Sequence, residues 1–289
     1  MFFTYRKITM FNFFPDPDTL YTLAESYFSG DGVSKDSAKA VKLYLRAAKM
    51  GHIESQRALS LCYDIGEGVP VDYKQSVYWL TKAAQQGDAE SQYELAKIYD
   101  KGEYGPPEPE KAVEWYRKAA EQGHIDAQNQ LGMALLEGVG IEQNKTEAMN
   151  WLFKAAQQGD ATAQFNIGMT YYLGDCLEKD KAKAVEWIYK SAKQKDIWAI
   201  FQLLDMYING ELEDNEVDLD VTEELNERLK TVDDDPVLVG IRSLTIGKLI
   251  YFNNKSNPEK KAEALKWIEK AVQLKEEEAI DVLNKIKRQ

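Results

Sequence analysis

Apolar residues recur with helical spacing along most of the chain, and the pattern repeats every 36 residues from Asp18 onward. Each block carries two stretches in which apolar positions lie three and four residues apart, separated by a loop that contains glycine. This spacing places the apolar side chains on one face of a helix, so each block predicts a helix–loop–helix unit. A fixed period over several blocks indicates a stacked repeat array rather than two globular domains. Blocks 1 to 5 are residues 18–53, 54–89, 90–125, 126–161 and 162–197.

Equivalent positions of the blocks carry the same kinds of residue, which identifies the expected core and the expected turns. A leucine column in the first helix and a tryptophan column in the second are expected to be buried, with Trp115 between the two helices of its block. A glycine column predicts that the first helix ends in a left-handed residue. The columns are Leu23, Leu59, Leu95, Leu131 and Ile167; Leu43, Trp79, Trp115, Trp151 and Trp187; and Gly30, Gly66, Gly102, Gly138 and Gly174.

The residues that precede the predicted helices are of the capping type. A short side-chain oxygen before the second helix can accept hydrogen bonds from the first amides of that helix. In the turn between blocks, histidine exchanges with aspartate at one position, so we interpret the histidine as a cap rather than as a metal ligand or a general base. The second-helix caps are Asp36, Asp72, Glu108, Asn144 and Asp180, and the turn position holds His52, Asp88, His124, Asp160 and Asp196.

The block ESQYELAKIYDKGEYGPPEPEKAVEWYRKAAEQG (residues 90–123) resembles the Sel1-like repeat (SLR), a slightly longer relative of the tetratricopeptide repeat. The matching elements are Leu-x-x-x-Tyr in the first helix, the Gly-x-Gly-Val loop of the sister blocks, Lys-Ala-x-x-Trp in the second helix and the closing Ala-Ala-x-x-Gly. The resemblance is strong over residues 18–197 and weak beyond them. It implies an all-α fold, a right-handed α-solenoid of about seven helix–loop–helix repeats, whose first helices line the concave side. Members of the family serve as adaptors and scaffolds.

The period also divides the chain into segments. The regular blocks are preceded by an aromatic stretch and followed by a region in which the pattern degrades and then resumes. The predicted segments are an N-terminal aromatic segment or cap (1–17), five regular repeats (18–197), a degenerate repeat with an acidic insertion (198–240), a final repeat (241–275) and a C-terminal capping helix (276–289).

The composition fits a folded, acidic protein and excludes several classes of function. Of the 289 residues, 44% are hydrophobic, and the formal net charge is −12. This excess of negative charge argues against a protein that neutralises nucleic-acid phosphates or docks on anionic lipid. No apolar run approaches the roughly 20 residues that span a bilayer. We therefore expect neither nucleic acid nor a membrane as a partner.

No motif of metal binding or catalysis emerges from the sequence. The chain has two histidines and two cysteines, and it lacks His-Glu-x-x-His, zinc-type Cys/His spacing, Gly-x-Ser-x-Gly and Ser-x-x-Lys. Gly66-Glu67-Gly68 is not followed by Lys-Ser/Thr and recurs as a helix-ending turn, so we do not interpret it as a phosphate loop. We expect no enzymatic activity, no cofactor and no metal.

The cysteines and the N-terminus favour the cytoplasm. Cys62 and Cys176 lie three blocks apart, far beyond the roughly 7 Å that a disulfide allows between Cα atoms, so both are expected to be free thiols. The first 14 residues lack the continuous apolar core and the cleavage site of a secretory signal. Whether translation starts at Met1 or at Met10 stays open.

An acidic segment interrupts the pattern after block 5. Residues 211–235 contain 12 Asp/Glu and 2 Lys/Arg, so the local excess is 12 − 2, or ten negative charges. The segment lacks the glycine and the twelfth-position glutamate of a calcium-binding EF-hand loop. A solvated loop and a docking surface for a basic partner both remain open. The residues that would dock a basic partner are Asp214, Glu216, Asp218 and Asp220.

The first helices also present a face that changes from block to block. It lies opposite the buried stripe, and its charge and size differ in each block, so it does not perform the common stacking task. Leu61 with Ile65, and Met169 with Leu173, place apolar residues one turn apart on this face. For the column of Leu61 and Met169, packing within the repeat remains an alternative. The candidate contact residues are Leu61, Ile65, Glu94, Lys97, Lys101, Gln130, Met133, Glu137, Asn166, Met169 and Leu173.

These observations predict a non-enzymatic protein-binding module in a bacterial cytoplasm, an adaptor or scaffold that binds a protein or peptide along its concave face. The alternative is an immunity protein that neutralises a basic toxin through residues 211–235. An enzyme is a distant third possibility, because no nucleophile, metal or cofactor set is recognisable.

Overall fold

The structure is a computed structural model, and its contacts divide the chain into two compact units, Met1–Asn144 and Lys145–Gln289. Residues 1–14 of the N-terminal segment, the acidic residues 211–235 and most of the predicted capping helix lie outside the described residues. The described residues are 15–194, 196–208, 243–244, 247–248, 250–251, 258–273, 279–280 and 282–284.

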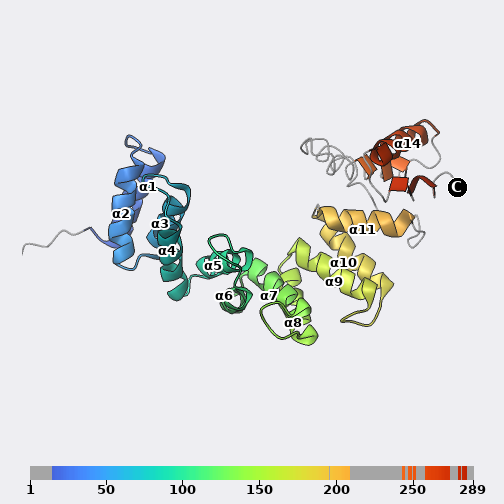
Figure 1. The fold of residues 1–289 in the computed structure, drawn as a ribbon, viewed down its shortest axis with the longest axis horizontal. Coiled ribbons are helices and arrows are strands. Elements are labelled where there is room, and N and C mark those ends of the chain that lie inside the picture. The colour runs from blue at the N-terminus through green and yellow to red at the C-terminus, as the bar shows by residue number, and fades with distance from the viewer. Residues whose placement is uncertain are drawn as a thin grey trace, which may run out of the picture. The chain divides into compact units, whose positions relative to one another are not determined.

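Every regular element within the described ranges is an α-helix, and each block folds as the predicted helix pair (Figure 1). The helices are α1 (Pro17–Ser29), α2 (Ser37–Lys49), α3 (Ile53–Ile65), α4 (Tyr73–Gln85), α5 (Ala89–Lys101), α6 (Pro109–Glu121), α7 (Ile125–Glu137), α8 (Lys145–Gln157), α9 (Ala161–Leu173), α10 (Lys181–Lys193), α11 (Ile197–Ile208) and α14 (Pro258–Gln273).

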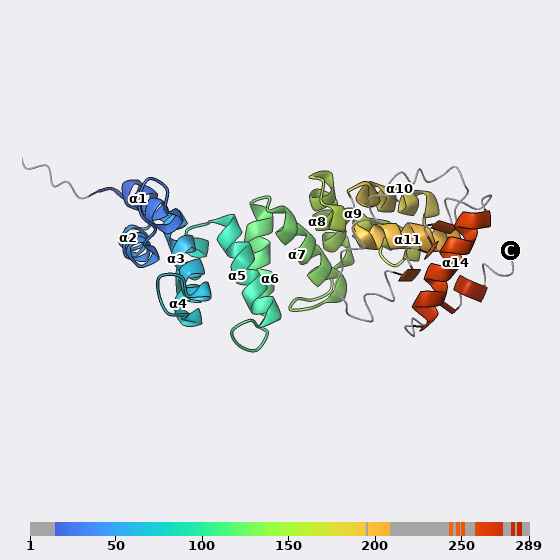
Figure 2. The ribbon, with the colours of Figure 1, turned by 90° about the horizontal axis from the view of Figure 1, so that it is seen from above.

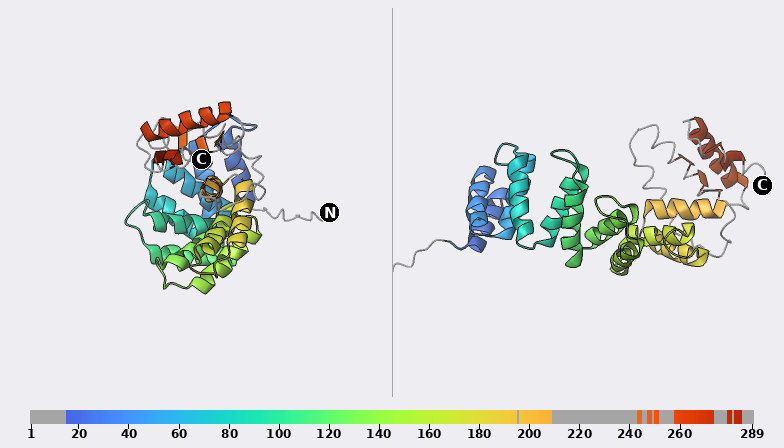
Figure 3. Two further views of the ribbon diagram at one scale, coloured as in Figure 1. Left: turned by 90° about the vertical axis from the view of Figure 1, so that its right-hand side faces the viewer. Right: turned by 60° about the horizontal axis from the view of Figure 1, so that its bottom comes forward.

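Helices that follow one another in the chain pack side by side. In the first unit, α1 packs on α2, α3 on α4 and α5 on α6 (Figure 2). Contacts of α2 with α3, of α4 with α5 and of α6 with α7 join each pair to the next. In the second unit, α9 packs on α10, while α8 contacts α9 and α10 contacts α11 (Figure 3). This sequential packing is the arrangement that the 36-residue period predicts.

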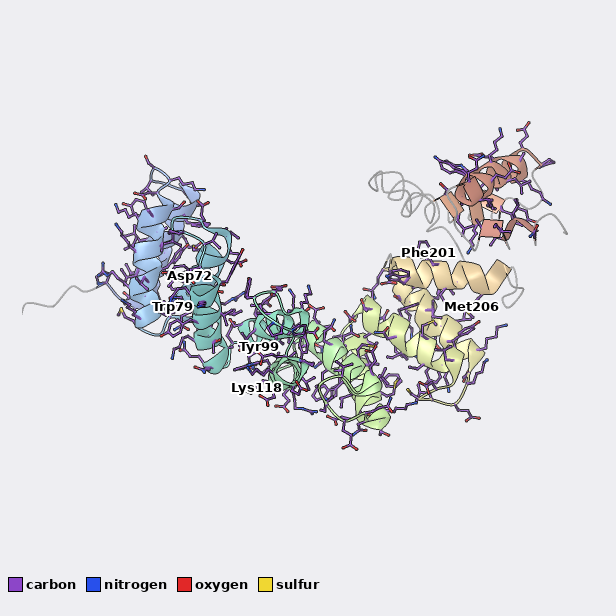
Figure 4. The ribbon with its side chains drawn as sticks, viewed as in Figure 1. Asp72, Trp79, Tyr99, Lys118, Phe201 and Met206 are labelled. Atoms are coloured by element: carbon purple, nitrogen blue, oxygen red, sulfur yellow. The ribbon has the colours of Figure 1, made fainter. Side chains whose placement is uncertain are left out.

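The predicted caps account for where most helices begin. The side chains of Asp36, Asp72 and Asp180 each accept a hydrogen bond from an amide in the first turn of the second helix; Asp72 is labelled in Figure 4. Glu108 makes no such side-chain bond, so the cap expected there is wrong. Its longer side chain instead places Oε2 2.5 Å from the Nζ of Lys111.

The Gly-x-Gly loops make a contact between blocks. Gly66 ends α3 in the left-handed region with φ of 75°. Gly68, with φ of 76°, lies so close to the carbonyl group of Ser37 at the start of α2 that a Cβ atom would overlap it. Gly140 approaches the backbone of Pro109 in the same way. The second glycine therefore lets the loops of blocks 2 and 4 rest on the second helix of the preceding block.

A buried glutamine in the first helix of each of blocks 2 to 5 ties neighbouring blocks together. Gln92 is 5% exposed, and its Nε2 donates to the carbonyl oxygen of Ala84 in α4 over 3.0 Å. Its Oε1 accepts a hydrogen bond from the Nε2 of Gln122 in the turn after α6, over 2.8 Å. The donated bond recurs in each of blocks 2 to 5, always to a carbonyl eight residues earlier. The members of this glutamine ladder are Gln56, Gln92, Gln128 and Gln164.

The predicted leucine column is buried in blocks 2 to 5 but not in block 1. Leu95 packs against Leu80 and Ala84 of α4, the second helix of the preceding block. No described helix precedes α1, so Leu23 lacks such a cover and is 41% exposed. The expectation of burial is therefore wrong at Leu23. The equivalents without exposed surface are Leu59, Leu95, Leu131 and Ile167.

The tryptophans of the second helices lie mostly at the edge of the core. Trp79 is buried as expected, whereas Trp115 is half-buried, so the prediction for Trp115 is wrong. The Nζ of Lys118, labelled in Figure 4, lies 3.8 Å from the centre of the Trp115 ring. A lysine one turn later thus covers the outer face of the ring with its cation and its aliphatic stem. Similar pairs are Lys154–Trp151 and Lys190–Trp187.

The second unit contains a sixth first helix after block 5. This helix, α11, buries Met206 (labelled in Figure 4) in a core cluster with Ile188 of α10. Further along the chain, α14 begins at Pro258, within the predicted final repeat. Its Ala264 and Ala271 have no exposed surface and belong to a core cluster with Ile268.

Candidate interaction surface

None of the candidate contact residues on the first helices is buried. Leu61 and Ile65 of α3 are 53% and 56% exposed, and Leu173 at the end of α9 is 64% exposed. Met169, in the same column as Leu61, is half-buried and packs against the core cluster that contains Ile188. Packing within the repeat, one of the two alternatives for this column, thus holds for Met169, whereas Leu61 is largely exposed. The other candidates are half-buried or exposed: Glu94, Lys97, Lys101, Gln130, Met133, Glu137 and Asn166.

A cleft of about 480 Å³ opens among three consecutive first helices of the first unit. Its lining includes Tyr21 of α1, Leu61 of α3 and Glu94 of α5, together with side chains of α4 and of the loop after α5. We call it the block-2 cleft, because α3 and α4 of block 2 supply most of its walls. Two of the candidate contact residues, Leu61 and Glu94, line it.

Two hydrogen bonds between side chains lie in the block-2 cleft. The hydroxyl of Tyr104, in the loop after α5, donates to the carboxylate of Asp64 on α3. Burial, first, and this carboxylate, second, raise the pKa of Tyr104, so the phenol stays protonated and remains a donor. Deeper in the cleft, the buried hydroxyls of Ser60 and Ser76 lie 3.1 Å apart. These groups hold the walls of the cleft in place.

Acidic side chains outnumber basic ones in the block-2 cleft. Four carboxylates and one guanidinium line it. The Nε of Arg57 lies 3.8 Å from the carboxylate of Asp88, which already balances part of its charge. The Nζ of Lys97 lies 2.9 Å from the carboxylate of Glu94 and balances that charge in turn. The lining charges are those of Glu54, Asp64, Glu94 and Glu103 on the acidic side and of Arg57 on the basic side.

Sequence reasoning missed Asp64 and Tyr104 as site residues. Tyr104 occupies the third position of the Gly-x-Gly loop, where blocks 1, 2 and 4 carry the second glycine. Its ring stacks on Tyr73 of α4, with centroids 4.6 Å apart and planes 14° apart. The available signal was a tyrosine in a column that is glycine in three of the five blocks, because only a departure from the period distinguishes a block from its neighbours.

The two histidines cap helices, and one of the two cysteines lies in the core. The Nδ1 of His52 accepts a hydrogen bond from the amide of Ser55, and His124 caps α7 in the same way, which confirms their interpretation as caps. Cys62 and Cys176 are free thiols. Burial raises the pKa of Cys62 to about 11, so at neutral pH this thiol is protonated and is a poor nucleophile.

Neither metal ligation nor membrane insertion has support among the described residues. Within these ranges, no three His, Cys, Asp or Glu side chains are grouped as metal ligands. None of the described helices combines the length and the apolar character that crossing a bilayer requires. What the described surface offers is apolar contact, hydrogen bonds and charge.

The chain is similar to known repeat proteins over most of its length. A structure of c5321, a protective antigen present in uropathogenic Escherichia coli strains and displaying an SLR fold, superposes with a TM-score of 0.74 at 29% identity, over 93% of this chain and 56% of that one. A Sel1 repeat protein from Oxalobacter formigenes gives 0.72 at 27% identity, over 93% and 76%. This chain thus spans little more than half the length of the Escherichia coli protein. No curated protein sequence matches it.

The repeat itself is matched directly. The Sel1 repeat model covers five full 36-residue segments and a shorter sixth one, where the sequence alone suggested about seven repeats. No catalytic family accompanies it. The matched residues are 17–52, 53–88, 89–124, 125–160, 161–196 and 255–275. The chain therefore belongs to the Sel1 repeat family, and its fold is the all-α, sequentially packed helix-pair array of that family.

Proposed function

We propose that the protein is a non-enzymatic interaction module that binds a segment of another bacterial protein along the exposed sides of its first helices. The observation that carries the proposal is the exposure of large apolar side chains on these helices, with Leu61 lining a cleft of about 480 Å³. An apolar side chain that contributes little to the core, beside a cleft with polar walls, is typical of a partner contact.

The variation between blocks supports the same proposal. The columns that form the core keep their residue type, as in the glutamine ladder, whereas the exposed columns of the first helices change from Ile65 to Lys101 to Glu137. Stacking constrains the first set in every block. The second set is free of that constraint, so its residues can be matched to one partner.

Substitution of Ile65 or Leu173 by lysine tests whether these side chains are surface contacts. Both lie more than half exposed, so we expect each variant to lose less than about 0.5 kcal/mol of unfolding free energy, as surface substitutions usually do. Thermal melts followed by circular dichroism provide the measurement. The control is Leu59→Lys in α3, which places an ammonium group at a fully buried position and should unfold the block.

Partner capture then tests the binding role. The wild-type chain and the two lysine variants serve as baits for a native bacterial lysate, with mass spectrometry of the retained proteins. We expect a partner that wild type retains to bind a variant about tenfold more weakly, the effect of losing a desolvated anchor. A large loss of stability in both variants, or equal retention of every captured protein, would remove these residues from the binding surface.

A second candidate function is neutralisation of a basic toxin or effector. The observation that favours it is the excess of ten negative charges in residues 211–235, which lie outside the described residues. A concentrated charge of one sign accelerates association with an oppositely charged partner. A toxin encoded beside this chain would be the partner to test.

Neutralising four carboxylates in this segment tests the second candidate. In a chain with Asp214→Asn, Glu216→Gln, Asp218→Asn and Asp220→Asn, we expect slower association with a basic partner and a flatter dependence of the rate on salt, because steering by charge is lost. Stopped-flow association at several salt concentrations provides the measurement. An association rate equal to that of wild type at every salt concentration would show that the segment is a solvated loop rather than a docking surface.

A further inference from the structure

The block-2 cleft exists where block 2 departs from its neighbours. In blocks 1 and 3, a tyrosine of the second helix reaches toward the first helix, and its hydroxyl donates to a carboxylate there. Block 2 carries Leu80 at this position, which has neither the ring nor the hydroxyl. Leu80 lines the cleft. The equivalent tyrosines are Tyr44, which donates to Glu25, and Tyr116, which donates to Asp100 over 3.3 Å.

Two further departures in block 2 place hydroxyls on the floor of the cleft. Ser60 and Ser76 stand where blocks 1 and 3 carry alanine. Both serines are buried and line the cleft, and their oxygens lie 3.1 Å apart. One serine hydroxyl donates its hydrogen to the other. Both oxygens keep lone pairs that can accept a hydrogen bond from a ligand. Blocks 4 and 5 also carry an aliphatic residue in place of the tyrosine, but alanine or glycine in place of the serines: Leu152 and Ile188, with Gly132, Gly168, Ala148 and Ala184.

The walls of the cleft favour a positive charge. Asp64 is the equivalent of Asp100, yet no tyrosine of its own block reaches it; Tyr104 of the next block donates to it instead. Glu103, beside Tyr104, adds a second carboxylate, and Arg57 is partly balanced by Asp88. In a partly enclosed site with apolar walls, such an excess of negative charge attracts a cation more strongly than it would in open water.

Apolar side chains complete the cleft. Leu61, Leu80 and Ile98 line it beside the carboxylates. A ligand that suits this lining has an aliphatic stem, to contact these side chains, and a cationic head with several hydrogen-bond donors. The guanidinium of arginine has five N–H donors in a planar fork, which suits a carboxylate and neighbouring hydroxyl oxygens better than a single ammonium does.

We propose that the block-2 cleft binds an arginine side chain of the partner protein, with the stem against Leu61 and Ile98 and the guanidinium at Asp64 and the Ser60–Ser76 pair. This inference rests on the proposed function, since it assigns an anchor to the same surface. It also makes the choice of partner specific: a segment with an exposed arginine beside an apolar residue binds here, and an acidic segment does not.

A substitution that fills the cleft tests the proposal. Leu80→Tyr gives block 2 the side chain that Tyr44 and Tyr116 provide in blocks 1 and 3, so the fold already accommodates it there. The probe is a fluorescein-labelled peptide of glycine and leucine with one central arginine, and the readout is fluorescence polarisation with the full chain. We expect saturable binding by wild type and at least about tenfold weaker binding by Leu80→Tyr, since the tyrosine occupies the site of the guanidinium.

Matched peptides and variants separate charge from shape. A peptide with citrulline, the neutral isostere of arginine, should bind at least about tenfold more weakly, because the charge-assisted hydrogen bonds are lost. Asp64→Asn should have a similar effect, whereas Glu121→Gln, which removes an exposed carboxylate at the end of α6 that does not line the cleft, should leave binding unchanged. If Leu80→Tyr fails to fold, the double variant Ser60→Ala and Ser76→Ala takes its place, because it restores the alanine pair of blocks 1 and 3.

Several results would overturn the assignment: equal binding of the citrulline peptide, equal binding by a folded Leu80→Tyr or double-serine variant, or no binding of the arginine peptide by wild type up to about 1 mM. A lysine peptide that binds as tightly would overturn the choice of arginine. The proposed function fails separately, through the melts and the partner capture with Ile65→Lys and Leu173→Lys, whose side chains do not line the cleft.

Discussion

Replacing Gly68 with alanine is expected to lower the free energy of unfolding by about 3 kcal/mol, the sum of backbone strain and overpacking. The backbone of Gly68 has φ of 76°, which residues with a Cβ adopt at a cost. In addition, the new Cβ would overlap the carbonyl group of Ser37, so the loop of block 2 must move away from α2. Urea unfolding followed by circular dichroism measures the loss.

Gly32 supplies the matched control for this substitution. It occupies the same column and has φ of 70°, but a Cβ there would meet nothing within 4 Å. Gly32→Ala should therefore cost only the backbone strain, about 1 kcal/mol. The difference between the two variants isolates the contact between blocks. Equal losses would mean that the loop of block 2 does not rest on α2 as described.

Replacing Gln92 with alanine is the second substitution with a large expected effect. It removes a buried side chain that bonds to both neighbouring blocks, and it leaves the carbonyl of Ala84 and the amide of Gln122 without these partners. The Ala84 carbonyl still accepts a hydrogen bond from the amide of Gly87, and the exposed Gln122 can bond to water, so we expect the loss of two hydrogen bonds to cost about 2 kcal/mol. The same urea unfolding measurement applies.

An exposed glutamine provides the comparison for Gln92. Gln143 donates one hydrogen bond to the carbonyl of Leu136 at the surface, where water can replace it. Gln143→Ala should cost less than about 0.5 kcal/mol, as surface substitutions usually do. A loss of less than about 1 kcal/mol for Gln92→Ala would show that the glutamine ladder contributes little beyond packing.

The repetition of the sequence was enough to predict the fold, because the same type of residue at equivalent positions of several blocks indicates whether that position is buried, capping or in a turn. The glycine column predicted the ends of the first helices, and the turn column predicted the caps at His52 and His124. The wrong predictions arise where a position lacks the neighbour that its column implies. Leu23 has no described preceding helix, and the longer side chain of Glu108 does not fold back to cap α6.

The block-2 cleft could not be predicted in this way, because it results from positions at which the period fails. Leu80, Ser60 and Ser76 look unremarkable one by one, and only their juxtaposition creates the space. The glutamine ladder could not be predicted either, because nothing in the sequence indicates that Gln92 bonds to Gln122, thirty residues away. Contacts between blocks depend on how helices superpose, which a single helical wheel does not represent.

The glutamine ladder also makes the array modular in units of one period. Removal of residues 90–125 would bring Ala84 to the place of Ala120, so Gln128 would find the same carbonyl acceptor eight residues before it. Blocks can thus be lost or duplicated while the hydrogen bonds between neighbouring blocks are kept, and the number of repeats can change without a new fold. The cleft does not share this property, because it draws Glu94, Ile98 and Tyr104 from block 3. Loss of block 2 or block 3 would preserve the scaffold while removing the cleft, so arrays without either block are expected to lose the proposed binding of arginine.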